Sequence, residues 1–115
     1  MHIAIDIDGT LTKNPKQLGR LINAVFEAHH VTFLTGTLGV PNKPERRAQV
    51  AALGIPNIER IPIEICAGRS VEDVAKLKGQ FCKERTVDIL FEDTDTYLFY
   101  VKKISPETSC FKIYG

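Results

Sequence analysis

Cysteine is scarce in this 115-residue chain, which contains only Cys66, Cys82 and Cys110. An odd number of cysteines without a CxxC pair argues against a disulfide framework and against a structural zinc site. We therefore expect three reduced thiols that are largely buried, as free cysteines usually are.

Long hydrophobic runs and an excess of one charge are also missing. No stretch is long enough to span a bilayer, and the apolar start of the chain meets Asp6 and Asp8 too early for the core of a signal peptide. The formal net charge is +1, so charge does not indicate a nucleic acid or a membrane as partner, although a local basic patch stays open. We expect a soluble, cytoplasmic protein.

Length and composition favour one globular domain. Apolar residues make up 43% and charged residues 25% of the chain, as in ordinary soluble proteins. A chain of 115 residues suits a single domain, which we place at 1–115.

Apolar strand-like runs alternate with amphipathic helical runs. The strand candidates lie at 3–7, 31–34, 61–65, 87–91 and 110–114, and the helix candidates at 15–26, 43–53 and 70–82. Residues 36–42 are expected to form a loop. Pro62 lies within the third strand candidate, so we place that strand at a sheet edge. The segment 96–103 is ambiguous, because its aromatic residues favour a strand and its position favours a helix.

Three residues predict where helices begin or end. Asn14, directly before Pro15, and Ser70 are candidate N-caps. Gly54 follows the second helix, where a left-handed residue often ends a helix.

The alternation of strands and helices predicts an α/β fold. We expect a Rossmann-like three-layer sandwich with a mainly parallel central sheet of about five strands. In such sheets, reactive groups gather outside the carboxyl ends of the strands. Three strand ends carry polar residues, at 6–10, 35–37 and 92–95.

Carboxylates from two of these strand ends would repel one another if they converged. A hard divalent cation with oxygen ligands resolves that conflict, and Mg²⁺ commonly takes one or two carboxylates together with water and a substrate phosphate. In the Asp-x-Asp pair, Asp6 can face a substrate while Asp8 reaches the other side of the transferred group. Gly9 permits a tight exit from the strand. A plain strand-to-turn exit with aspartate hydrogen bonding is the alternative reading of these residues.

The ordered motifs resemble those of the haloacid dehalogenase (HAD) superfamily over residues 3 to about 104. DIDGTLT at 6–12 is similar to its first motif, FLTGT at 33–37 to its second, and LFEDTD at 90–95 to its fourth. The lysine of the third motif is best matched by Lys78, with Lys76 as the competitor. Many relatives have Asp-Asp or Gly-Asp where this chain has Glu92-Asp93, and we choose Asp93 as the metal ligand.

The resemblance implies a magnesium-dependent phosphomonoester hydrolase. Asp6 would be the nucleophile that forms an aspartyl-phosphate, and Asp8 would protonate the leaving group and later activate water. The Asp6 and Asp93 carboxylates and the Asp8 carbonyl would hold Mg²⁺. Lys78 would neutralise charge on Asp6 and on the phosphoryl group. The phosphoryl oxygens would be bound by the Thr35 hydroxyl and by nearby backbone N–H groups, with Gly9, Thr10 and Gly36 as the substrate-binding residues.

The spacing of the elements leaves no room for a cap domain. Members without a cap are expected to act on large substrates or to use a second copy as a lid, so we predict a homo-oligomer. The class of phosphorylated substrate stays open. The rival interpretation is a non-catalytic HAD-like binding domain, although both Asp6 and Asp8 are retained. Arg46 and Arg47 could face a phosphate-bearing substrate, but we expect them on a solvated helix face.

Overall fold

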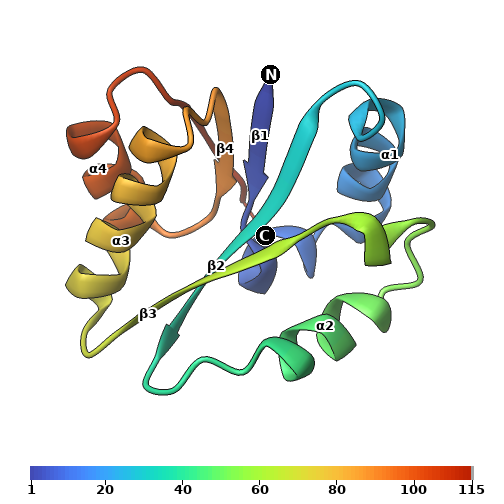
Figure 1. Ribbon diagram of the computed structural model, residues 1–115, viewed down its shortest axis with the longest axis horizontal. Coiled ribbons are helices and arrows are strands. Elements are labelled where there is room, and N and C mark those ends of the chain that lie inside the picture. The colour runs from blue at the N-terminus through green and yellow to red at the C-terminus, as the bar shows by residue number, and fades with distance from the viewer. Residues whose placement is uncertain (115) are drawn as a thin grey trace.

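A five-stranded parallel sheet forms the centre of the protein in the computed structural model, which describes residues 1–114 (Figure 1). The strand order is β3-β2-β1-β4-β5, and all four neighbouring pairs are parallel. The strands are β1 (His2–Ile5), β2 (His30–Leu38), β3 (Ile63–Gly68), β4 (Ile89–Glu92) and β5 (Ser109–Lys112).

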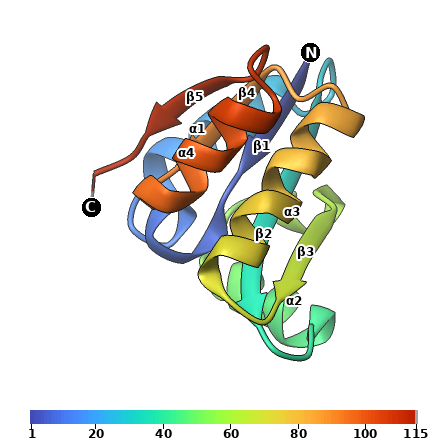
Figure 2. The same ribbon diagram turned by 90° about the vertical axis from the view of Figure 1, so that its left-hand side faces the viewer.

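Four helices cover the two faces of this sheet. They are α1 (Pro15–Val25), α2 (Lys43–Ala51), α3 (Val71–Glu84) and α4 (Asp95–Ile104). α3 and α4 lie side by side on one face, and α1 and α2 lie on the other (Figures 1 and 2). The predicted α/β, Rossmann-like three-layer sandwich is therefore confirmed.

Each face buries its own apolar cluster. Ile3 and Ile5 of β1 pack with α1, which contributes Leu18 and Ile22 to the same cluster. Ala4, between them in the strand, packs on the opposite face. This follows from the period of two in a strand, since alternate side chains point to opposite faces.

The edge position of β3 and two helix ends agree with the sequence. β3 is at the edge of the sheet, although it begins directly after Pro62 rather than containing it. The Ser70 hydroxyl accepts a 3.1 Å bond from the Asp73 N–H, and Gly54 is left-handed with φ +68°. Asn14 precedes α1 as expected, but its side chain donates to the Thr10 carbonyl and does not cap the helix.

The structure decides the ambiguous segment 96–103 and corrects part of the expected loop at 36–42. Residues 96–103 are helical, because parallel β4 and β5 need a crossover connection, and α4 supplies it. The expected loop at 36–42 is wrong in its first part, since β2 continues through Leu38. Residues 34–38 pair only with β3, because β1 pairs with β2 no farther than Phe33.

The three thiols are free, with Cys66 and Cys82 buried and Cys110 half-buried, as expected. Within residues 1–114, none of the helices has the length and apolar character needed to cross a bilayer.

Candidate functional site

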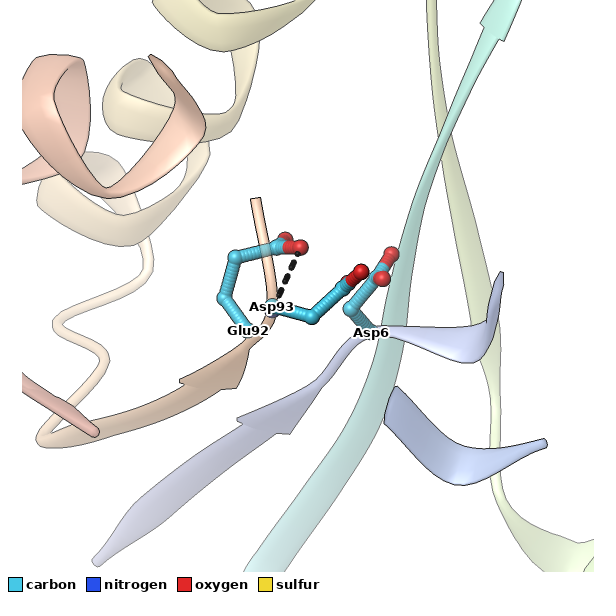
Figure 3. Close-up of side chains that lie close together, drawn as sticks. All are labelled: Asp6, Glu92 and Asp93. Carbon is cyan, nitrogen blue, oxygen red and sulfur yellow. Dashed lines mark hydrogen bonds between the residues drawn. The ribbon is translucent and has the colours of Figure 1, made fainter. Parts of the chain in front are cut away.

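Three carboxylates meet at the carboxyl ends of the neighbouring strands β1 and β4. Asp6 follows β1, Glu92 ends β4 and Asp93 comes next. One oxygen from each lies within 4.8 Å of the others, and the three side chains turn toward one another (Figure 3). All the donors are hard oxygen atoms, which is the ligand type that Mg²⁺ prefers.

Lys78 of α3 reaches the same cluster from the face that α3 and α4 cover. Its side chain is fully buried, and its Nζ lies 2.9 Å from Asp6 Oδ1 and 2.6 Å from Glu92 Oε2. Lys76, its competitor, is half-exposed and pairs with Glu72 on the helix surface at 3.1 Å. The structure thus brings Lys78, and not Lys76, to Asp6.

The cluster brings three acids and one lysine together, and burial and their contacts shift the pKa of Asp6, Glu92 and Lys78. Burial raises the pKa of Asp6 and of Glu92, while the adjacent Lys78 ammonium opposes both shifts. Burial alone would lower the pKa of Lys78, but the two carboxylates raise it above its usual range, so the ammonium stays charged. A cation that enters beside Asp93 would meet carboxylate oxygens and would oppose the effect of burial on Asp6 and Glu92.

Both carboxylate oxygens of Glu92 already accept hydrogen bonds within the protein. Its Oε2 accepts from Lys78, and its Oε1 accepts from the N–H groups of Asp93 at 3.0 Å and Thr94 at 3.3 Å. Bonds from N–H donors favour the ionised carboxylate. Asp93, by contrast, is half-buried, and its Oδ1 accepts one 3.1 Å bond from the Thr10 hydroxyl.

A wide turn over Ile7–Leu11 carries the chain away from Asp6. The Leu11 N–H donates to the Asp6 carbonyl at 3.2 Å, Asp8 is extended, and Gly9 is left-handed with φ +78°. A Cβ at Gly9 would overlap the Asp93 carboxylate. Gly9 is therefore needed both for its backbone angle and for the close approach of Asp93.

The Asp8 carboxylate lies apart from the other three and is held by α2. Its Oδ2 accepts from Arg46 at 2.6 Å, and its Oδ1 accepts from Gln49 at 2.6 Å. Partial burial would raise the pKa of Asp8, but these two bonds and the charge of Arg46 lower it below its usual value. Any part of Asp8 in a metal site would therefore come from its backbone carbonyl.

Arg46 also binds a carbonyl of β2 at a level where β1 has already ended. Its second terminal nitrogen donates to the Gly36 carbonyl at 2.9 Å, at the level of β2 that β1 no longer reaches. Arg47 donates to the carbonyls of Ile58 and Ile61. The expectation that both arginines lie on a solvated helix face was wrong, because both find backbone carbonyls beside α2.

Thr35 sits near the end of β2 and is almost completely buried, with 1% of its surface exposed. Ile5 pairs with Phe33, so Thr35 lies beyond the end of β1, close to the level of Asp6. Among the described residues, its hydroxyl is the one buried side-chain polar atom without a hydrogen-bond partner. A buried orphan of this kind costs about 1–3 kcal/mol unless a ligand or water satisfies it.

The three residues expected to bind phosphoryl oxygens through nearby groups all have contacts inside the protein. The Gly9 N–H donates to Thr12 Oγ1 at 3.0 Å, and the Thr10 hydroxyl donates to Asp93. Gly36 has its carbonyl bound by Arg46, and a Cβ there would overlap Val74. Of these contacts, only that of Gly9 engages an N–H group, so phosphate binding by N–H groups of Thr10 and Gly36 stays a prediction.

Sequence reasoning placed Glu92 in this region but not against Lys78, and it did not find Gln49 or Tyr97 there. Glu92 was visible as half of an acidic pair, but only the structure shows that it binds Lys78. Gln49 and Tyr97 carry no local signal, since their contacts are with residues far away in the chain. In comparisons with known proteins, no family model and no curated protein matches this chain.

Proposed function

We propose that this protein is a magnesium-dependent phosphomonoester hydrolase of the HAD type, which forms an aspartyl-phosphate on Asp6. The observation that carries the proposal is the grouping of Asp6, Glu92 and Asp93, in which the buried Lys78 pairs with Asp6 and Glu92 and leaves Asp93 without a cationic partner among the described residues. The order of the motifs along the chain, at 6–12, 33–37 and 90–95, supports the same assignment.

A purely structural ion pair is a poorer account of this cluster. One buried carboxylate would be enough to pair with Lys78, whereas each further buried charge adds a desolvation cost of several kcal/mol. An excess of acids at a strand end of a parallel sheet is typical of a site that takes a cation or a charged ligand. The unpaired hydroxyl of Thr35 supports a ligand with hydrogen-bond acceptors nearby.

The residues that would hold Mg²⁺ are Asp6 and Asp93, together with the Asp8 carbonyl. Glu92 is less free to serve, because Lys78 and two N–H groups already occupy its oxygens. Bound Mg²⁺ would polarise a phosphoryl oxygen and reduce the repulsion between the anionic substrate and the acids.

The protein's own residues then divide the reaction between them. A carboxylate oxygen of Asp6 attacks phosphorus, and the bond from phosphorus to the leaving oxygen breaks while Asp8 gives that oxygen a proton. Water next attacks the phosphorus of the aspartyl-phosphate, Asp8 takes the proton from water, and Asp6 and inorganic phosphate are released. Lys78 and Thr35 stabilise the charge on the phosphoryl oxygens.

Asp8 must move before it can give a proton. Both of its oxygens accept bonds from α2, and a carboxylate held by an arginine is ionised. Rotation of the Asp8 side chain away from Arg46 therefore precedes proton donation. The exposure of this side chain, 57%, leaves room for that rotation.

The experiment is a screen of phosphomonoesters with and without Mg²⁺, covering phosphosugars, nucleotides, phosphopeptides and polynucleotide ends. We expect hydrolysis that needs Mg²⁺ and disappears in Asp6→Asn. Asp95→Asn is the matched control, since Asp95 is an exposed acid on α4 that pairs with Lys112. Failure of the wild type on every substrate, or full turnover by Asp6→Asn, would favour the rival, a non-catalytic binding domain.

A further inference from the structure

The aromatic ring of Tyr97 covers the buried ammonium of Lys78. Tyr97 lies in the first turn of α4, and its ring centroid is 4.4 Å from Lys78 Nζ. This is well within the range at which a cation is attracted to the negative face of an aromatic ring. Tyr97 thus contacts the only cation that the described residues place inside the acidic cluster.

A count of hydrogen-bond donors indicates why the ring is there. An ammonium has three N–H donors. One goes to Asp6 and one to Glu92, and Lys78 is fully buried, so no bulk water reaches the third. The ring face is the remaining neighbour with negative charge density, and a buried donor without any such neighbour would be costly.

Contacts among β2, α3 and α4 determine where the Tyr97 ring lies. A Cβ on Gly36 would lie 3.2 Å from the Tyr97 hydroxyl oxygen and 3.7 Å from Lys78 Cε, and it would overlap Val74 of α3. The absence of a side chain at Gly36 therefore lets α3 and α4 bring Lys78 and Tyr97 against β2. α3 and α4 pack closely on one another, which keeps the backbones that carry Lys78 and Tyr97 side by side.

We propose that Tyr97 is a positioning residue whose ring, rather than its hydroxyl, holds Lys78 between Asp6 and Glu92. The predicted effect of the ring on turnover rests on the proposed phosphatase function, whereas the contact between the ring and Lys78 does not. No hydrogen bond joins the Tyr97 hydroxyl to another described residue, so the hydroxyl adds nothing to the hold on Lys78.

The test compares Tyr97→Phe, which keeps the ring, with Tyr97→Leu, which removes it. In protein labelled with [ε-¹³C]lysine, the Lys78 signal, assigned by its loss in Lys78→Arg, should lie upfield because of the ring current. We expect this displacement to persist in Tyr97→Phe and to vanish in Tyr97→Leu. Phe99→Leu is the matched control, because Phe99 is an exposed aromatic residue of the same helix.

Turnover provides the second measurement. Loss of the ring should lower kcat about thirtyfold, the equivalent of ~2 kcal/mol for a desolvated cation–π contact, with KM changed by less than about twofold. Tyr97→Phe and Phe99→Leu should keep kcat within about twofold of the wild type. If Tyr97→Leu does not fold, Tyr97→Met replaces it, since methionine fills irregular space.

The outcomes separate this inference from the proposed function. If the wild type hydrolyses no phosphomonoester, the phosphatase proposal fails, and the position of the Lys78 signal still decides the role of the ring. An unshifted Lys78 signal in the wild type, or a shift that survives in Tyr97→Leu, overturns the inference. An equal loss of turnover in Tyr97→Phe and Tyr97→Leu also overturns it, because the hydroxyl would then be the active part.

Discussion

Replacing Lys78 by methionine removes the one buried cation that the described residues place beside Asp6 and Glu92, and it nearly preserves the length of the side chain. The two carboxylates then lose charge-assisted bonds of 2.9 and 2.6 Å and remain buried without a cationic partner. Removal of one partner from a buried ion pair typically costs about 3–5 kcal/mol. We expect a loss of that size in the free energy of unfolding, which is a large part of the roughly 5–15 kcal/mol that a domain has in total.

The assay is urea unfolding followed by circular dichroism, first with EDTA and then with saturating Mg²⁺. A ligand at a hundred times its Kd stabilises the folded state by about 2.7 kcal/mol. We expect Mg²⁺ to raise the stability of Lys78→Met more than that of the wild type, because the variant leaves more negative charge for a cation to neutralise. The m-value should stay unchanged, since the surface exposed on unfolding is the same.

Lys76→Met is the matched control on the same helix, two residues away. Lys76 is half-exposed and contacts Glu72 and the Tyr100 ring at the surface, where such contacts contribute little, so its loss should leave the unfolding midpoint nearly unchanged. The reasoning is refuted if Lys78→Met unfolds at the same urea concentration as Lys76→Met. If Lys78→Met loses the expected stability but Mg²⁺ does not change the stability of the variant, only the proposed Mg²⁺ site is refuted.

Three further predictions concern other parts of the molecule. Asp8→Asn should lose about a hundred- to ten-thousandfold of turnover on an alkyl phosphate and much less on p-nitrophenyl phosphate, whose leaving group needs no proton; equal losses on the two substrates would count against Asp8 as the acid. Gly9→Ala should cost at least ~1–2 kcal/mol in urea unfolding, because alanine is strained at φ +78° and its Cβ would overlap the Asp93 carboxylate; wild-type stability would show that the turn is not held as described. Iodoacetamide should label Cys110 before Cys82 in the native protein, because burial raises the pKa of Cys82 to about 12 and so reduces its thiolate at neutral pH, whereas Cys110 is half-buried; mass spectrometry of timed samples would detect the opposite order.

Local sequence signals were enough for the architecture. The alternation of apolar runs with amphipathic runs predicted a parallel sheet covered by helices, because a parallel connection needs a crossover helix. Pro62 indicated an edge strand, since proline has no N–H to donate, and Ser70 indicated a helix start, since its hydroxyl can satisfy a free N–H. Each of these signals depends on one residue and its near neighbours.

The sequence also placed acids at the ends of strands, and with them the region of the candidate site. Asp6 and the acidic pair at 92–93 were expected to converge because parallel strands end at the same edge of a sheet. That inference needs only the order of the strands. It does not say which acid binds a lysine and which stays free for another partner.

The resemblance implied that Lys78 meets Asp6, but the tertiary structure alone decided that Glu92 shares Lys78 and that Asp8 takes Arg46. Lys78 and Glu92 are 14 residues apart, and Arg46 and Asp8 are 38 apart, so no local pattern connects them. Arg46 binds Asp8 and the Gly36 carbonyl at the level where β1 has ended at Ile5 and β2 continues. The partner that each acid finds depends on where each strand ends and on how α3 and α4 pack together. These positions are fixed only when the chain has folded, so the sequence pattern alone does not give them.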